Sequence, residues 1–242
     1  MERSREIRLH TSLLAAVEKR CLVWMAQRLP RAINSDHLTA LAAIAMLGAG
    51  ICYWVAPGAP AALWGVVLLL VANWFGDSLD GTLARVRRHE RPRYGFYVDH
   101  VLDAVGILFL IAGLVLGGFM SLSIGAGFLI AYYLLTNEIA LATHTVGTFR
   151  ISYWKFGPTE LRILLAIGTL QLLHSPEVSL FGRRLLLFDV GAGVATIGLF
   201  VTFIVSAIRN TRTLYAAEPL PPDARPPLPV QLREARVGSA TH

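Results

Sequence analysis

Four aspartates lie close together in the sequence, in two short segments whose other residues are mostly apolar. Asp77 and Asp80 are three residues apart, and Asp99 and Asp103 are four residues apart. At 3.6 residues per turn, the members of each pair share one face of a helix. Burying ionised carboxylates among apolar groups is costly, and four of them together repel one another. The sequence therefore predicts a cationic partner for this cluster.

The side-chain types around the aspartates indicate what that partner is. Four carboxylates without paired histidines or cysteines are hard oxygen ligands, which favour Mg²⁺, Mn²⁺ or Ca²⁺ over zinc. Two divalent cations would neutralise the four negative charges and would clamp a phosphoryl group. Gly81 and Gly95 leave room for a ligand to approach the backbone, and Arg85 offers donors to phosphate oxygens. We expect a metal-dependent site for a phosphorylated ligand.

The composition indicates that these residues belong to an integral membrane protein. The chain has 242 residues, of which 55% are hydrophobic and only 16% are charged, whereas an ordinary soluble domain is about 25% charged. The net charge of +6 would also suit a nucleic-acid-binding protein. In so apolar a chain, however, basic residues belong in loops facing the cytosol and anionic lipid. We expect membrane lipid as a partner and no nucleic acid.

Apolar runs separated by polar or Gly/Pro-containing links predict six transmembrane helices. These runs cover, approximately, residues 38–56, 61–84, 95–115, 120–143, 159–174 and 190–208. The first run has nineteen residues and reaches about 28 Å as a helix, enough for one crossing. Ser35 or Asp36 is expected to cap its N-terminus. The predicted fold class is an all-α integral membrane protein with six transmembrane helices preceded by an N-terminal amphipathic interfacial helix.

Two segments flank the transmembrane catalytic domain, which we assign to residues 35–210. In residues 1–34, apolar positions recur at three- and four-residue steps among basic ones. This pattern predicts an amphipathic helix that lies in the membrane interface or packs on the cytosolic face of the protein. Residues 211–242 are rich in proline and charged residues, which predicts a disordered cytosolic tail.

The distribution of basic residues predicts the orientation. Arginine and lysine gather in the N-terminal segment, in the links after the second and fourth runs and at the start of the tail. The links after the first and third runs carry no charge. By the positive-inside rule, both termini and the aspartates face the cytosol, and the expected location is a bacterial inner membrane. Arg183 and Arg184, between the last two runs, are an exception to this pattern.

The aspartates are part of a longer pattern, D-x2-D-G-x2-A-R-x9-G-x3-D-x3-D. The pattern is complete in Asp77, Asp80, Gly81, Ala84, Arg85, Gly95, Asp99 and Asp103. It resembles the signature of the CDP-alcohol phosphotransferases, and the six-span plan and the preceding helix resemble that family as well. The resemblance implies transfer of a substituted phosphate from a CDP-alcohol to an acceptor hydroxyl, with release of CMP, in phospholipid biosynthesis.

The resemblance also implies roles for individual residues. Asp77, Asp80 and Asp99 would hold two Mg²⁺ or Mn²⁺ ions, with a contribution from Asp103. Asp103 would also be the general base that takes the proton of the acceptor hydroxyl. Gly81, Ala84, Arg85 and Gly95 would line the CDP site. Members of the family are typically homodimers, and the same is expected here.

The acceptor is left open between two branches. In one branch CDP-diacylglycerol donates to inositol phosphate, glycerol phosphate or serine, and in the other a CDP-amino-alcohol donates to diacylglycerol. The candidate acceptor-binding residues are polar and lie in or beside the fourth and fifth runs: Asn137, Glu138, Arg150, Lys155, Glu160 and Arg162. Residues 147–150 and 157–160 resemble choline/ethanolamine phosphotransferases, which favours the amino-alcohol branch, although those enzymes commonly have additional spans.

Each candidate side chain also has a plainer interpretation. Arg150, Lys155 and Arg162 would form the basic pocket that a phosphorylated acceptor needs, or would simply anchor the cytosolic face. Asn137 and Glu138, polar within the fourth run, would bind a head group or bridge two helices.

Other protein classes also place carboxylates in helical bundles. A prenyltransferase of the UbiA type would need a second aspartate-rich motif, which Asp189 alone does not supply. An ion transporter or a non-enzymatic cation-binding protein would carry its acids near the membrane midplane. The aspartates would also satisfy a structural role as solvated helix-end residues paired with Arg85, Arg87 and Arg88. The fixed glycine and Ala-Arg positions favour the enzyme.

Overall fold

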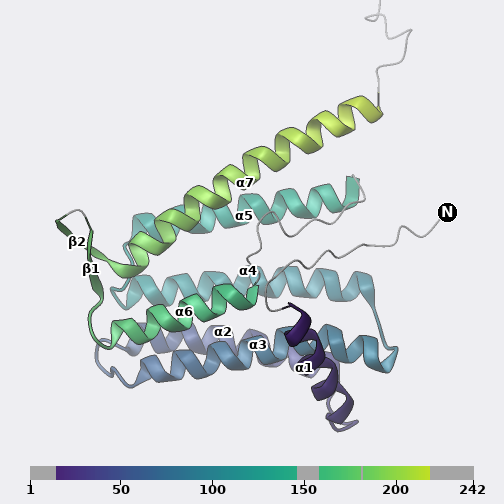
Figure 1. Cartoon of the computed structure of the whole chain (residues 1–242), viewed down its shortest axis with the longest axis horizontal. Coiled ribbons are helices and arrows are strands. Elements are labelled where there is room, and N and C mark those ends of the chain that lie inside the picture. Colours follow the sequence, from purple (N-terminus) through teal and green to yellow (C-terminus); the bar gives the residue numbers. More distant parts are fainter. Residues whose placement is uncertain (1–14, 146–157, 181, 219–242) are drawn as a thin grey trace, which may run out of the picture.

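The computed structural model describes residues 15–145, 158–180 and 182–218. Within these residues the chain forms seven helices and one β-hairpin, shown in Figure 1. The elements are α1 (Ala15–Arg28), α2 (Ser35–Val55), α3 (Ala62–Arg87), α4 (Pro92–Leu116), α5 (Leu122–Thr145), α6 (Pro158–Leu172), β1 (Glu177–Leu180), β2 (Arg183–Leu186) and α7 (Leu187–Ala217).

Five helices have the length and apolar composition to cross a membrane: α2, α3, α4, α5 and α7. The helices are therefore consistent with an integral membrane protein. The expected fifth span corresponds to α6, which has only 15 residues. At 1.5 Å per residue it is about 22 Å long, less than the roughly 30 Å of a hydrocarbon core. The sixth span is not confirmed.

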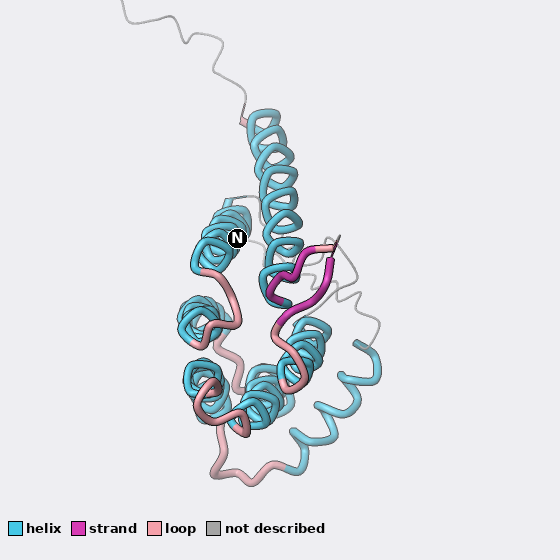
Figure 2. The backbone as a smooth tube through the Cα atoms, turned by 90° about the vertical axis from the view of Figure 1, so that its left-hand side faces the viewer, coloured by secondary structure: helices cyan, strands magenta, loops and turns pink. Residues whose placement is uncertain are grey.

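Two segments have structures that the sequence analysis does not predict. Helix α7 continues to Ala217, so residues 211–217 belong to this helix and not to the expected tail, and residues 219–242 lie outside the described part. The link before α7 forms an antiparallel hairpin in which Glu177 pairs with Leu186 and Leu180 with Arg183. Figure 2 shows this hairpin beside the start of α7, in a view in which most other helices are seen end on.

Helix α2 lies at the centre of the packing around the acidic residues. It packs against both α3 and α4, whereas α3 and α4 make few or no direct contacts with each other. Glycines allow this close approach, because a Cβ on Gly113 would overlap the backbone at Gly50 of α2, and a Cβ on Gly76 of α3 would overlap that at Leu38. Helices α3 and α4 are therefore joined through α2.

The apolar core is concentrated at the end of the bundle remote from the acidic residues. Tyr53 of α2, Val66 of α3 and Leu114 of α4 are fully buried there. A second, smaller cluster joins α1 to α2 and α3 and includes Leu22 and Leu79.

Helix α1 runs steeply across the direction of the other helices (Figure 1). One side of it is buried on α3 through Leu22 and Ala26, while Trp24 on another side is 55% exposed. A helix is thus present in this segment, but the expected amphipathic helix is not confirmed. Its location in a membrane interface stays a prediction.

The N-terminus of α2 differs from the expected cap. Asn34 is the N-cap: its Oδ1 accepts a 3.0 Å hydrogen bond from the backbone N–H of His37, and Nδ1 of His37 accepts one from the N–H of Asn34. Ser35 and Asp36, the expected caps, instead bind residues outside their own helix.

Candidate active site

The four aspartates occupy the last turns of α3 and the first turns of α4. Asp80 is buried, Asp77 and Asp99 are partly exposed and Asp103 is exposed. Asp77 and Asp103 lie one helical turn further from the α3–α4 link than Asp80 and Asp99 do, about 4.5–6 Å along the helix axes. The carboxylates of Asp80 and Asp103 each interact electrostatically with other members of the set. The four acids therefore share one electrostatic environment across two helices that make few or no direct contacts with each other.

Asp80 is held from two directions. Thr39 Oγ1 on α2 donates a 2.6 Å hydrogen bond to Asp80 Oδ2, and the backbone N–H of Gly81 donates to Oδ1. Ser35, one turn before Thr39, donates from Oγ to the backbone carbonyl of Asp80 at 2.9 Å. The first turn of α2 thus fixes both the backbone and the carboxylate of Asp80.

Asp77 is held by a residue of α6. Nη2 of Arg162 donates to Oδ2 of Asp77 at 2.5 Å, and Nε of the same guanidinium donates to Oδ1 of Asn73 at 2.7 Å. Asn73 is buried and donates from Nδ2 to the carbonyl oxygen of Ala42 on α2 at 3.1 Å. Three helices therefore meet at Asp77.

A cavity of about 940 Å³ lies beside these residues. Its walls come from the start of α2, the end of α3, the α3–α4 link and the start of α4. Six of the eight pattern residues line it: Asp80, Gly81, Ala84, Arg85, Gly95 and Asp99. Its volume is in the range of small-molecule and cofactor sites. Asp77 and Asp103 are not among its lining residues.

The rim of the cavity carries cations and aromatic rings. Arg91 donates from Nη2 to both carboxylate oxygens of Asp36, at 2.5 and 2.7 Å, and stacks over the ring of Tyr94 at 4.2 Å. The hydrogen bond from Arg91 to Asp36 raises the pKa of the Arg91 guanidinium above its ordinary value, so Arg91 stays charged. Arg85 and Phe96 also line the cavity. Such a rim suits an anionic ligand with an aromatic part.

The oxygen atoms of the four carboxylates are suitable ligands for divalent cations. Four carboxylates from two helix faces supply hard oxygen ligands, and their mutual repulsion is relieved by a cation. Within the described residues, no group of three or more His, Cys, Asp or Glu side chains already stands in an arrangement that could hold a metal ion. The two-ion centre therefore stays a prediction that the donor chemistry supports.

The candidate acceptor-binding residues do not form one group in the described part of the chain. Glu138 of α5 is buried and accepts hydrogen bonds from Ser206 Oγ at 2.8 Å and from Asn210 Nδ2 at 2.7 Å, both on α7. Glu138 thus bridges two helices. Asn137 is exposed.

The other candidates lie further along the chain. Glu160 is in the first turn of α6. Arg162 binds Asp77 and Asn73. Arg150 and Lys155 lie outside the described residues.

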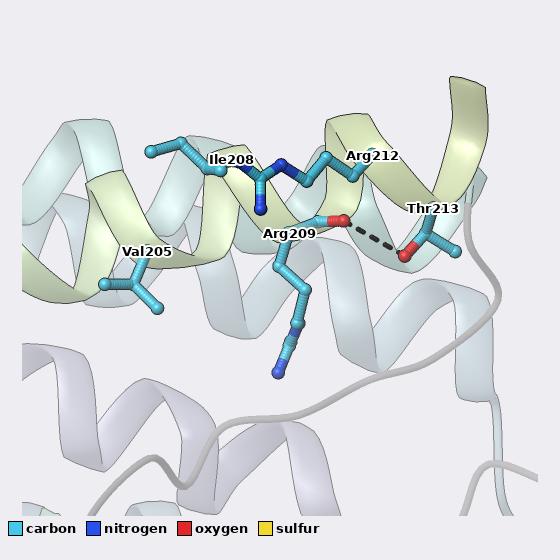
Figure 3. A pocket seen from close by; sticks show the side chains of 5 residues that line it. All are labelled: Val205, Ile208, Arg209, Arg212 and Thr213. Atoms are coloured by element: carbon cyan, nitrogen blue, oxygen red, sulfur yellow. Dashed lines mark hydrogen bonds between the residues drawn. The ribbon is translucent and has the colours of Figure 1, made fainter. Parts of the chain in front are cut away.

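A second, smaller hollow of about 470 Å³ lies on α7 and is shown in Figure 3. It is lined by Val205, Ile208, Arg209, Arg212 and Thr213. Figure 3 shows Arg209 pointing away from α7 and Arg212 lying along the helix toward Ile208. Arg209 and Arg212 are among the basic residues near the start of the tail from which the orientation is predicted.

Two residues of the site were not singled out in the sequence as functional. Thr39 binds Asp80, and Asn73 anchors the arginine that binds Asp77. A signal existed for each: Ser35 and Thr39 share a helix face, and so do Asn73 and Asp77, because each pair is four residues apart. What the sequence lacked was the identity of the facing helix.

Comparison with known proteins shows which family the chain belongs to. A search of curated proteins finds no significant match to the chain. A family model described as CDP-alcohol phosphatidyltransferase matches residues 33–205, which is more than half of the 242 residues. The match extends from the N-cap of α2 into α7 and includes all eight pattern residues. The chain therefore belongs to the CDP-alcohol phosphatidyltransferase family, whose members are membrane transferases of substituted phosphate groups in phospholipid synthesis and use divalent metal ions.

Proposed function

We propose that this protein transfers a substituted phosphate from a CDP-alcohol to an acceptor hydroxyl, releases CMP, and requires Mg²⁺ or Mn²⁺. The observation that carries this proposal is the cavity of about 940 Å³ that six of the eight pattern residues line. The cavity has carboxylates that would bind cations and arginines that would bind phosphate. It also has glycine and alanine, whose small size would let a nucleotide approach the helix.

Each group of residues would have a separate role in the reaction. Asp77, Asp80 and Asp99, with a contribution from Asp103, would hold two cations, which would stabilise the negative charge on the phosphate of the departing CMP. Gly81, Ala84, Arg85 and Gly95 would bind the CDP part of the donor. Asp103 would accept the proton of the acceptor hydroxyl. The new bond joins the acceptor oxygen to the transferred phosphorus, and the bond from that phosphorus to the oxygen of CMP breaks.

For the substrates, we propose a CDP-amino-alcohol donor and diacylglycerol as acceptor. A phosphorylated acceptor needs a basic pocket, but one of the three basic candidates, Arg162, already binds Asp77 and Asn73. This supports a lipid acceptor. The alternative is CDP-diacylglycerol as donor with inositol phosphate, glycerol phosphate or serine as acceptor, for which Arg150 and Lys155 remain candidates.

We further propose that the active site and both termini face the cytosol, that the protein lies in a bacterial inner membrane and that it works as a homodimer. The orientation rests on the arginines of the α3–α4 link, which also form part of the cavity rim. The uncharged α2–α3 link is at the opposite end of α3.

Release of CMP tests the reaction. The purified full chain in lipid is given Mn²⁺ or Mg²⁺ with each pair from a panel of CDP-alcohols and acceptors. We expect CMP from at least one pair and its loss in Asp80→Asn. The matched control is Glu177→Gln, which removes a charge from the exposed hairpin. If no pair yields CMP, the enzyme proposal fails; prenyl transfer or cation binding without turnover would then identify one of the other classes.

A further inference from the structure

Arg162 approaches the acidic residues from α6, a helix that carries none of the pattern residues. We propose that Arg162 is a positioning residue that orients the Asp77 carboxylate for cation binding. This inference rests on the proposed function, because it concerns the same acidic residues. It assigns a role to a side chain outside the eight-residue pattern.

The geometry fixes the guanidinium at two points. Its Nη2 binds Asp77 and its Nε binds Asn73, at 2.5 and 2.7 Å. Asn73 and Asp77 are four residues apart, so both face Arg162 from one side of α3. Asn73 is itself tied to the Ala42 carbonyl of α2. The planar fork of arginine therefore has a fixed direction relative to two helices.

The contact fixes the direction of the carboxylate as well. Oδ2 of Asp77 is bound to Arg162, and within the described residues no donor binds Oδ1. The ion pair is partly shielded, with side-chain exposures of 16% for Arg162 and 33% for Asp77. When one oxygen of a carboxylate is held by a hydrogen bond, the other oxygen points in a defined direction. Residues that hydrogen-bond to metal ligands commonly orient them in this way.

The positive charge of Arg162, unlike its orienting effect, would weaken the binding of a cation. A guanidinium beside the acidic residues repels an incoming cation, and its carboxylate neighbours include Asp103 as well as Asp77. If repulsion were its main effect, removal of the charge would strengthen cation binding. If orientation is its main effect, removal weakens binding. The two effects therefore differ in sign, and our proposal commits to the second.

Binding of Mn²⁺ alone tests the proposal without turnover. Free Mn²⁺ is measured by electron paramagnetic resonance during titration of the full chain in nanodiscs. We expect Arg162→Gln to weaken Mn²⁺ binding about 10- to 100-fold, the usual effect of losing a residue that orients a metal ligand. Arg162→Lys keeps the charge but cannot span Asp77 and Asn73, so it should also bind more weakly than the wild type. Arg184→Gln is the matched control, because it removes an exposed arginine charge from the hairpin.

Asn73→Ser provides a second variant, since it keeps Arg162 and removes its anchor. Weaker binding in this variant supports the proposal even if Arg162→Gln cannot be purified. Binding as tight as that of the wild type, or tighter, in the purified variants overturns it. A wild type that binds no Mn²⁺ would instead overturn the proposed metal centre, and this inference with it.

Discussion

Thr39 on α2 donates its hydroxyl hydrogen to Oδ2 of Asp80 on α3 across a 2.6 Å contact. Asp80 is the most deeply buried of the four aspartates, with 8% of its surface exposed. A buried carboxylate without a donor is costly, so this hydroxyl both stabilises Asp80 and fixes its direction. The relationship makes α2 a structural part of the acidic site, although α2 carries no pattern residue.

Replacing Thr39 by valine should impair the site more than the fold. The variant keeps the shape of the side chain but removes a hydrogen bond to a charged group, which contributes about 1.5–3 kcal/mol. We expect CMP release to fall roughly 10- to 100-fold, measured under saturating Mn²⁺. Thr202→Val is the control, because among the described residues the Thr202 hydroxyl binds only the Gly198 carbonyl of its own helix. Equal activity in the two variants would contradict the assigned role.

Asp103 can be tested separately from the other aspartates. Asp103→Asn preserves size but removes the proton-accepting carboxylate. We expect a fall in CMP release of about 10²- to 10⁴-fold, as for the loss of a general base, with Mn²⁺ binding changed only a few-fold. Unchanged turnover would rule out the base role. Loss of Mn²⁺ binding would show that Asp103 acts chiefly as a ligand.

Gly81 lies on the wall of the cavity, where a larger side chain should exclude the nucleotide. A Cβ at this position would lie 3.5 Å from Nη1 of Arg85, an ordinary contact, so the helix tolerates a side chain. We expect Gly81→Val to raise the KM for the CDP-alcohol about 5- to 100-fold, from an overpacking cost of about 1–3 kcal/mol. Gly127→Val on α5 points into open space and should leave the KM unchanged. A similar KM in both variants would remove Gly81 from the nucleotide site.

The ion pair between Asp36 and Arg91 should matter for binding rather than for stability. Both side chains are about half exposed, at 45% and 54%, so Asp36→Asn should change the free energy of unfolding by less than about 1 kcal/mol. We expect the KM for the CDP-alcohol to rise up to about 5-fold, because the link is no longer held over the cavity. The difference from the wild type should shrink in 1 M salt, which screens exposed charges. A difference independent of salt would contradict this explanation.

Glu138 should prove to be a structural residue of the α5–α7 pair. Glu138→Ala removes its hydrogen bonds with Ser206 and Asn210 and should lower the free energy of unfolding by about 1–3 kcal/mol. Thermal unfolding in detergent measures this effect. The KM for the acceptor should stay unchanged at a temperature where the variant is folded. A higher KM with unchanged stability would assign Glu138 to acceptor binding instead.

The positions of the helices could be predicted from the sequence, but their neighbours could not. Uninterrupted apolar runs fix where a helix can lie in a membrane, and the described helices begin and end within a few residues of most predicted limits. The close approach of α2 to α4 at Gly50 and Gly113 depends on a match between two distant glycines. Each of them is unremarkable in its own run.

Contacts with other helices also explain why the N-cap of α2 was predicted wrongly. Ser35 and Asp36 both have the intrinsic preference for this position. Ser35 binds the Asp80 carbonyl and Asp36 binds Arg91, so Asn34 remains to cap the helix. The same limit applies to Arg162, which the sequence shows as one of several cations near a membrane boundary. Its partners on α3 become visible only in three dimensions.

The unequal lengths of α6 and α7 have a consequence for the surrounding lipid. With 15 and 31 residues, they measure about 22 and 46 Å, on either side of a typical hydrocarbon thickness. The hairpin between them has strand edges whose peptide groups require water or headgroups, and it carries Arg183 and Arg184. Were α6 to cross the membrane, the lipid beside the hairpin would have to thin locally to bring water or headgroups to these peptide groups. Helix α7, which is longer than the hydrocarbon core, would be accommodated by tilting or by extending past the headgroups.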